Sequence, residues 1–252
     1  MLTARQVLKI AGLAGKIILT NGAEIYRTED TIMQICHAYG IDDVESFVTP
    51  TGIFLSIDDG EYVHTKLKRV HNRTINLDKI SKINSFSRQL QEEKLGYKQA
   101  LAQLQKIEAE GPEYSFLAVT TLTSIACAMY VILVRANYIN FFPALIASFA
   151  SQLMIKQSGF LKEINYIPEM IAGFIAGLVA VLFQRLGGID YNLSVITVSG
   201  ILAFVPGVSA TNAIRDAIDN DLISATSRGT EVILSSISLA AGVALSLGGL
   251  NL

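Results

Sequence analysis

Two runs of 20 residues without a charged side chain, 115–134 and 136–155, restrict most strongly what this chain can fold into. An α-helix needs about 20 apolar residues to cross the hydrocarbon core of a bilayer, and it pairs its own backbone groups there. Three further apolar runs, 165–184, 191–214 and 232–252, meet the same requirement. The second half of the chain therefore predicts five transmembrane helices.

Charged residues are concentrated in the first half of the chain. Residues 1–114 contain 14 of the 20 lysines and arginines and 15 of the 22 aspartates and glutamates. We therefore expect a soluble domain over 1–114 and a transmembrane domain over 115–252. The net charge of −2 argues against a nucleic-acid partner, and the two distant cysteines, Cys36 and Cys127, argue against a disulfide scaffold or a zinc site. We expect neither a cofactor nor a metal.

Basic residues next to the spans predict their orientation, because loops rich in lysine and arginine stay in the cytoplasm. The loops after the second and fourth spans hold four basic residues and the alternate loops hold two, which are respectively Lys156, Lys162, Arg215 and Arg228, and Arg135 and Arg185. We therefore expect a multi-pass protein of the inner (cytoplasmic) membrane, with its N-terminus in the cytoplasm and its C-terminus outside. Lys16 interrupts the first apolar stretch, so we expect no cleaved signal peptide.

The soluble half has the pattern of an α+β domain. Apolar residues at helical spacing predict helices, and β-like runs separated by turn residues predict a three-stranded meander. The expected helices are 3–20, 23–39, 76–94 and 97–110, and the expected strands are 44–48, 52–57 and 62–70. The fold class is therefore an α-helical membrane protein of five spans preceded by a cytoplasmic α+β domain.

The fourth span contains Pro206 and Gly207 inside its apolar run. Proline removes a backbone hydrogen bond, so the helix should break or kink there, either as a packing kink or as a solute site. The polar residues Asn212, Arg215 and Asp216 follow at helical spacing, opposite isoleucines, which predicts an amphipathic helix at the cytoplasmic surface.

The fifth span is expected to open with Arg228 and Glu231. A carboxylate at the membrane edge either pairs with Arg228 and reaches water, or it couples a proton or orients the solute. Gly173 and Gly177 give the third span a GxxxG face, which predicts close packing against another helix.

The soluble half gives weak signals for chemistry. Glu24 and Arg27 share a helix face with two threonines, and this face can hold an anion or form internal pairs. There is no phosphate-binding loop and no GxSxG motif, so we expect no enzyme and assign no catalytic residue.

Three segments carry a resemblance to a known family. They are NGAEIYRTEDT at 21–31, FVTPTGIFLS at 47–56 and VPGVSATNAIRD at 205–216. With these segments the chain resembles the threonine/serine exporter family over nearly its whole length. The continuation through Asp221, Arg228 and Glu231 is similar to the family's pattern after its broken helix.

The resemblance implies a subunit of a secondary exporter. Full-length members join such a half to a second group of spans, whereas this chain resembles the large subunit of the two-component branch, which is linked to export of dicarboxylates such as succinate. The implied substrate is therefore a small carboxylate, or threonine or serine, moved across the lipid bilayer by ion-coupled alternating access. The implied partner is a short four-helix membrane subunit of the same family, or the chain forms a homo-oligomer.

The residues that we expect to form the substrate path and gate surround and follow the broken helix. They are Pro206, Gly207, Asn212, Arg215, Asp216, Arg228 and Glu231. We expect Arg215 to attract the substrate carboxylate and Asp216 to pair with Arg215 when the site is empty. In the cytoplasmic domain, the candidates within the matching segments are Glu24, Arg27, Thr49 and Thr51.

Two alternatives remain open at this point. One is a membrane-anchored protein whose cytoplasmic domain hydrolyses or senses a small ligand. The other is a scaffold subunit without transport activity, in which the polar residues of the spans only support packing.

Overall fold

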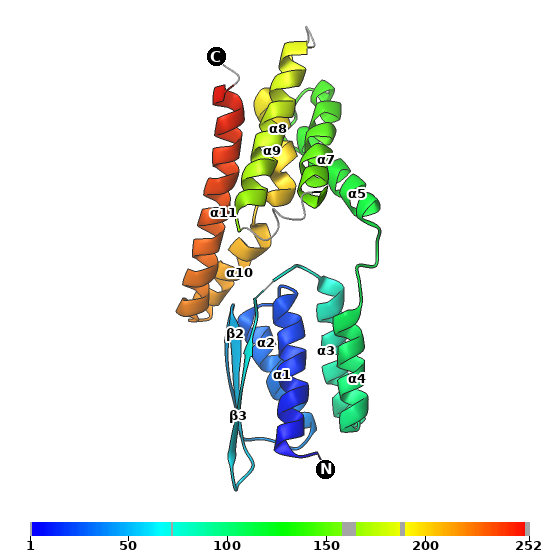
Figure 1. Cartoon of the computed structure of the whole chain (residues 1–252), viewed down its shortest axis with the longest axis vertical. Coiled ribbons are helices and arrows are strands. Elements are labelled where there is room, and N and C mark those ends of the chain that lie inside the picture. Colours follow the sequence, from blue (N-terminus) through cyan, green and yellow to red (C-terminus); the bar gives the residue numbers. More distant parts are fainter. Residues whose placement is uncertain (1, 72, 158–164, 187–189, 250–252) are drawn as a thin grey trace. The chain divides into compact units, whose positions relative to one another are not determined.

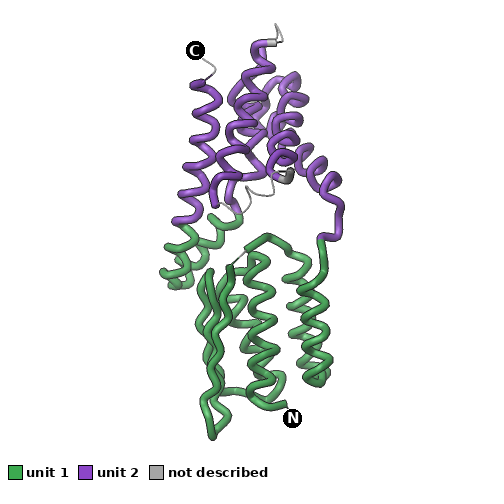
Figure 2. The backbone as a smooth tube through the Cα atoms, viewed as in Figure 1, with its two compact units in different colours: residues 1–111, 208–229 green, residues 112–207, 230–252 purple. Residues whose placement is uncertain are grey.

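The computed structural model describes residues 2–71, 73–157, 165–186 and 190–249. Contacts divide the chain into two compact units (Figure 2). Unit 1 comprises residues 1–111 and 208–229, and unit 2 comprises residues 112–207 and 230–252. The segment that follows the broken helix therefore packs with the N-terminal residues. Lys162, one of the basic residues used for the orientation, lies outside the described residues.

Unit 1 is an α+β structure in three layers (Figure 1). Its N-terminal part contains α1 (Ala4–Thr20), α2 (Ile25–Ala38), β1 (Val44–Thr49), β2 (Gly52–Asp58), β3 (Val63–Arg69), α3 (Leu77–Glu92) and α4 (Tyr97–Ala109). The strands form an antiparallel sheet in the order β1-β2-β3. Helices α1 and α2 cover one face of this sheet, and α3 and α4 pack on α1 from the other side. All these elements end within two residues of the expected positions.

Helix α1 forms the centre of unit 1. Thr3 and Gln6 form a capping box at its start, which satisfies backbone groups that a helix leaves unpaired. The residues of α1 that face the sheet and α2 are fully buried, including Ile10, Ala14 and Ile18. A Cβ at Gly15 would lie 2.6 Å from the Cδ1 atom of Ile32, so this glycine allows α1 and α2 to approach closely.

Unit 2 is helical. It contains α5 (Phe116–Ala128), α6 (Tyr130–Leu133), η1 (Tyr138–Asn140), α7 (Phe141–Gln157), α8 (Ile167–Leu186), α9 (Leu193–Ile201) and η3 (Leu202–Phe204). Two later helices are shared between the units: α10 (Gly207–Ile218) lies in unit 1 from residue 208, and α11 (Leu222–Gly249) lies in unit 1 up to residue 229.

Among the described residues, four helices, or five if a bent pair counts as one span, match the five expected membrane spans. Four helical segments are long and apolar enough to cross a bilayer: Phe116–Leu133, Tyr138–Ile155, Ile167–Arg185 and Leu222–Gly249. A fifth candidate is the pair Leu193–Phe204 and Gly207–Ile218, which is bent by 62°. The bend lies at Pro206, so the predicted break in the fourth span is confirmed.

The start of the fifth span differs from the expectation. Helix α11 begins at Leu222, ten residues before the expected start at 232. Asn220 has a positive φ of 63°, which ends α10, and the carboxylate of Asp221 then accepts a hydrogen bond from the Ser224 backbone N–H. Capping by Asp221 therefore starts the new helix early, and Arg228 and Glu231 lie within it.

The GxxxG face of α8 packs against α11 within unit 2. A Cβ at Gly173 would collide with the carbonyl group of Leu239, and one at Gly177 would collide with the hydroxyl group of Ser246. From the other helix, a Cβ at Gly242 would collide with the carbonyl of Met170. The expected close packing is confirmed, and its partner is a helix of the same chain.

Candidate functional site

The candidate site lies in unit 1, where α10 and the start of α11 contact the turn between α1 and α2. This turn begins at Asn21, whose side chain is bonded to the carbonyl of Ile17 at 2.6 Å. Gly22 follows with a φ of 96°, which favours glycine, and α2 starts at Ile25. The turn therefore presents the carbonyls of Gly22 and Ala23 to the helices that pack on it.

Two buried side chains donate hydrogen bonds to these carbonyls. Asn212 Nδ2 of α10 donates to Gly22 O at 3.2 Å, and Arg228 Nη2 of α11 donates to Ala23 O at 3.1 Å. Asn212 is 6% exposed and Arg228 is 5% exposed. The two helices are thus attached to adjacent peptide groups of the same turn.

Asp216 connects the same two helices to the N-terminus of α2. Its Oδ2 atom forms an ion pair with Arg228 Nε at 3.0 Å, although the N–H direction is not that of a hydrogen bond. Its carboxylate also accepts a hydrogen bond from the backbone N–H of Ile25, the first residue of α2. Glu24 precedes Ile25 and makes no side-chain cap, so Asp216 supplies the acceptor and negative charge that a helix N-terminus favours.

Glu24 holds the outer part of the site. Its carboxylate pairs with Arg215 Nη1 of α10 through Oε1, and with Arg27 Nε through Oε2 at 3.3 Å. The Arg27 N–H also donates to the Tyr26 hydroxyl at 3.0 Å, and this bond with the charge of Glu24 raises the pKa of Arg27. The Arg215 side chain is 42% exposed, so solvent reaches it, unlike the Asp216 and Arg228 pair.

We call this arrangement the latch: the side chains of Asn212, Arg215, Asp216 and Arg228 with their partners on residues 22–25. Its pairs differ from the expectation that Asp216 binds Arg215. Neighbouring residues on a helix point about 100° apart, so Arg215 and Asp216 reach different partners. Arg215 pairs with Glu24, and Asp216 pairs with Arg228.

Helix α10 is amphipathic as expected, but its polar side faces the protein. Asn212 and Asp216 are buried, whereas Ile214 and Ile218 are 64% and 73% exposed. The apolar side of α10 therefore faces away from the rest of unit 1. A helix that contacts lipid or another apolar partner has this arrangement.

A family model described as "Putative threonine/serine exporter" matches residues 9–248. The chain belongs to the threonine/serine exporter family. The match includes the whole latch. Two of the three segments that carry the resemblance, 21–31 and 205–216, supply its turn and most of α10, and Arg228 of α11 completes it. These segments are distant in the sequence and meet in unit 1.

Relatives of this exporter-family chain cover nearly its full length. It is 23% identical to "Probable succinate transporter subunit YjjP" of Klebsiella aerogenes, over 96% of this chain and 93% of that protein, and the protein of the same name in Escherichia coli K12 is also 23% identical. It is 24% identical to "Threonine/serine exporter" of Corynebacterium glutamicum, over 96% of this chain and 50% of that protein. No solved structure matches the chain significantly. With its apolar helices, this member of the exporter family is a multi-pass membrane protein.

The remaining candidates of the exporter-family chain lie outside the latch. Thr49 and Thr51 lie at the turn between β1 and β2, where Thr49 Oγ1 donates to Gly52 O at 3.3 Å and lies 3.5 Å from Thr51 Oγ1. Pro206 stands between η3 and α10, and a Cβ at Gly207 would meet no atom within 4 Å. Glu231 lies on α11 in unit 2, three residues after Arg228.

Sequence reasoning missed an acidic cavity of about 280 Å³ beside the latch. Its lining includes Glu29, Asp216, Asp219 and Asp221 with the ring of Phe47. Glu29 Oε1 accepts a hydrogen bond from the Val48 backbone N–H at 3.0 Å. Burial, and then the charge of Asp221, raise the pKa of Glu29. The signal for Glu29 was its place in the segment 21–31, but nothing in the sequence linked it to Asp221.

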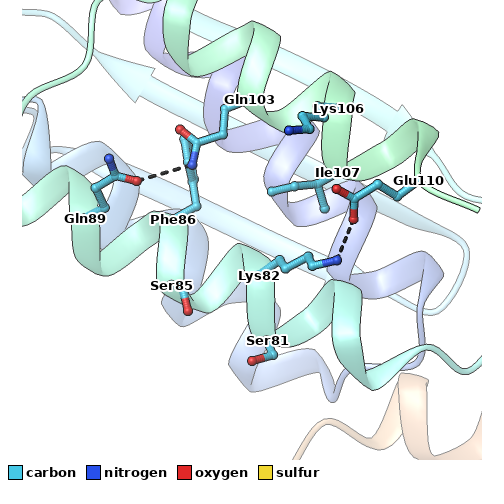
Figure 3. A pocket seen from close by; sticks show the side chains of 9 residues that line it. All are labelled: Ser81, Lys82, Ser85, Phe86, Gln89, Gln103, Lys106, Ile107 and Glu110. Atoms are coloured by element: carbon cyan, nitrogen blue, oxygen red, sulfur yellow. Dashed lines mark hydrogen bonds and ion pairs between the residues drawn. The ribbon is translucent and has the colours of Figure 1, made fainter. Parts of the chain in front are cut away.

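A second cavity of about 300 Å³ lies between α3 and α4 (Figure 3). Lys82 reaches Glu110 at 2.6 Å and Asp78 at 2.7 Å, and Gln103 donates to Gln89 at 3.2 Å. The ammonium group of Lys82 is thus held by two carboxylates. Ser81, Ser85 and Lys106 also line this cavity.

Proposed function

We propose that this chain is a subunit of a secondary exporter that moves a small carboxylate or a hydroxy amino acid out of the cell. Membership of the threonine/serine exporter family and the candidate membrane spans support this proposal. The names of the relatives add two substrate classes, succinate and threonine or serine. Ion-coupled alternating access is the mechanism that fits a chain of this family.

The latch is the observation that carries the proposal. Helix α10 follows directly after the break at Pro206, and its polar side is bonded to the turn at residues 22–25. Discontinuous helices commonly form solute sites in transporters, and their rearrangement opens one side of the site. A helix that continues from such a break and is attached to a soluble layer is suited to act as the gate on that side.

Within the gate, Arg215 is suited to meet the solute. Its partner Glu24 is 13% exposed, whereas Arg215 itself is 42% exposed. A guanidinium can bind a carboxylate in bidentate geometry, so a solute carboxylate could exchange with Glu24 as its partner. Arg228 and Asp216 are buried and hold the helices in place during this exchange.

The proposed topology places the N-terminal part in the cytoplasm and the C-terminus outside, in the inner (cytoplasmic) membrane. The segment 208–229 packs with residues 1–111, so we propose that α10 and the start of α11 lie at the cytoplasmic end of their spans, in contact with the cytoplasmic domain of residues 1–114. The names of two relatives call them subunits, which favours a partner. We propose a short four-helix membrane subunit of the same family as this partner, with a homo-oligomer as the alternative.

Export from cells or proteoliposomes tests the proposal, with labelled succinate and labelled threonine as the two probes. The full chain is expressed alone and with the candidate four-helix subunit. We expect export of at least one probe with the pair, and a strong reduction for Arg215→Gln. No export of either probe under any combination contradicts the proposal. Undiminished export after removal of every latch charge favours a scaffold role instead.

A further inference from the structure

The acidic cavity beside the latch contains more negative charge than the structure neutralises. Four carboxylates line it, those of Glu29, Asp216, Asp219 and Asp221, and all its lining residues belong to unit 1. Asp216 forms an ion pair with Arg228. Among the described residues, no lysine, arginine or histidine forms an ion pair with the other three carboxylates. The charges of these three side chains are therefore uncompensated.

The carboxylates of the cavity repel one another. Burial and then the charge of Asp221 raise the pKa of Glu29, and the charges of Asp219 and Asp221 oppose that of Asp216. Like charges at short range cost free energy in a partly buried site, because water screens them only weakly there. A positive group inside the cavity would remove this cost.

Asp216 retains an unused acceptor at the cavity. Its side chain is 1% exposed, and its Oδ2 atom accepts no hydrogen bond among the described residues, although it lies 3.0 Å from Arg228 Nε. Buried polar atoms usually form hydrogen bonds, because burial without them costs free energy. Since Asp216 lines the cavity, a donor bound inside it would supply the missing bond.

The positions of the carboxylates do not suit a single metal ion. A metal ion such as Mg²⁺ or Ca²⁺ needs several oxygens at about 2.0–2.6 Å around one point. Among the described residues, no three histidine, cysteine, aspartate or glutamate side chains lie close enough together to hold a metal ion. Glu29 comes from α2, whereas Asp219 and Asp221 come from the link between α10 and α11. A ligand that meets both groups must therefore carry positive charges that are separated from each other.

The rest of the lining suits an alkyl segment between such charges. Ile25, Tyr26 and Phe47 contribute apolar and aromatic surface, and aromatic faces attract cations. The guanidinium of Arg27 lies 5.9 Å from the ring centre of Tyr26 and pairs with Glu24, so the ring of Phe47 is the better contact for a ligand. The volume of about 280 Å³ is close to the lower end of the range for small-molecule sites, about 300 Å³.

We propose that the acidic cavity binds a linear organic dication, in which an alkyl chain separates two ammonium groups. One ammonium group binds Glu29, the other binds Asp219 and Asp221, and the chain between them packs on the ring of Phe47. An ammonium group has three donors and forms charge-assisted hydrogen bonds with carboxylates. The ligand thus bridges α2 to the link between α10 and α11 and stabilises the latch. This inference goes beyond the proposed function, because it does not depend on the exported solute.

Putrescine, butylamine and magnesium chloride are the probes that test the inference. Butylamine has the same alkyl chain with one ammonium group, and magnesium carries two charges at one point. The purified full chain is measured in detergent at constant ionic strength, by thermal stabilisation and by titration calorimetry. We expect putrescine to bind at least about tenfold more tightly than butylamine, because the second ammonium adds charge-assisted bonds. Magnesium should stabilise the chain no more than sodium chloride of the same ionic strength.

Asp219→Asn and Asp221→Asn test the assigned residues. Both substitutions keep the size of the side chain, and asparagine at position 221 can still cap α11. Each should weaken putrescine binding about tenfold without lowering the melting temperature in the absence of ligand. Glu45→Gln is the matched control, because it removes an exposed carboxylate on the same strand as Phe47 that does not line the cavity. We expect this control to keep full putrescine binding.

Three results would each overturn the inference. They are equal binding of butylamine, equal stabilisation by magnesium, and unchanged putrescine binding in the Asp219→Asn, Asp221→Asn double variant. Absence of putrescine binding at millimolar concentration by calorimetry overturns it as well. None of these measurements involves transport, so their failure leaves the proposed function standing. A chain that exports neither succinate nor threonine contradicts the proposed function and leaves the dication site standing.

Discussion

Asp216 and Arg228 form an ion pair with 3.0 Å between Oδ2 and Nε, and their side chains are only 1% and 6% exposed. The pair joins α10 to α11 on the inner side of the latch. Asp216 reaches from there to the N-terminus of α2, and Arg228 reaches the carbonyl of Ala23. One buried pair therefore connects three helices and the turn that carries the first matching segment.

Removing one partner of this pair should be strongly destabilising. Asp216→Asn keeps an acceptor for the Ile25 N–H but leaves the Arg228 charge buried without its counterion, and we expect a loss of about 3–5 kcal/mol. Arg228→Gln should cost a similar amount, and the double variant should recover part of the loss. Unfolding of the detergent-solubilised chain measures this. As a control, Lys16→Gln breaks a surface pair with Glu108 and should cost about 0–1 kcal/mol. Equal effects at the two sites would contradict this account.

Substitutions of Arg215 and Arg27 can be compared directly, because each arginine forms an ion pair with Glu24 and each is partly exposed. Only Arg215 lies on α10. If Arg215 attracts the solute carboxylate at the gate, Arg215→Gln should lower export about tenfold, since bonds to charged groups contribute about 1.5–3 kcal/mol. Arg215→Lys should be intermediate, and Arg27→Gln should leave export unchanged. Export rates normalised to inserted protein measure this, and equal losses in the two Gln variants would assign the effect to Glu24 alone.

Glu231 is the candidate for the coupling group. It lies near the start of α11, and a carboxylate carried from there to the centre of a bilayer costs about 2.5–3.5 kcal/mol, a cost that suits a group which takes up a proton. Glu231→Gln should keep solute exchange and lose uphill export driven by a pH gradient, because exchange needs only binding and the conformational change. Counterflow and uphill export in the same vesicles separate these steps. Intact gradient-driven export by this variant removes the coupling role.

Local sequence patterns predicted most of the elements but not the latch. The spacing of Asn212, Arg215 and Asp216 indicates that they share one side of a helix, and α10 has this amphipathic form. Periodicity does not indicate which surface covers that side. The structure buries it against residues 22–25, and Gly22 precedes Asn212 by 190 residues, whereas Ile214 and Ile218 stay exposed.

Helix ends show the same limit of sequence reasoning. The sequence placed the apolar run of the fifth span at 232–252, with Arg228 and Glu231 at its opening, because hydropathy marks the apolar part of a helix and not its first residue. Asp221 caps α11 through the Ser224 N–H, so α11 begins at Leu222, before Arg228 and Glu231. The segments 21–31 and 205–216 pointed to the site through resemblance, but only the fold shows that Glu24 meets Arg215 and that Asp216 meets Arg228.

Glu29 should make stability depend on pH. Burial and the charge of Asp221 raise its pKa, so the folded state binds this proton more tightly than the unfolded chain does. Stability from this group is therefore fully present below the ordinary glutamate pKa of about 4.3 and is lost as the pH rises through the raised value. Glu29→Gln keeps the acceptor for Val48 and should be more stable than the wild type at pH 7, with a difference that disappears towards pH 4. Melting temperatures across this range measure it, with the exposed Glu45→Gln as control, and a constant difference at all pH values would contradict the sign.

Gly242 should be required for the packing of α11 on α8. A Cβ at this position would collide with the backbone carbonyl of Met170, which cannot move without the helix, so Gly242→Ala must push the two helices apart. We expect a loss of about 1–3 kcal/mol, as for other overpacked sites. Gly248 lies on the same helix, but a Cβ there would meet no atom within 4 Å, so Gly248→Ala should change stability by less than about 1 kcal/mol. Thermal unfolding in detergent compares the two variants. If they melt together, the close contact between α8 and α11 does not exist in the membrane protein.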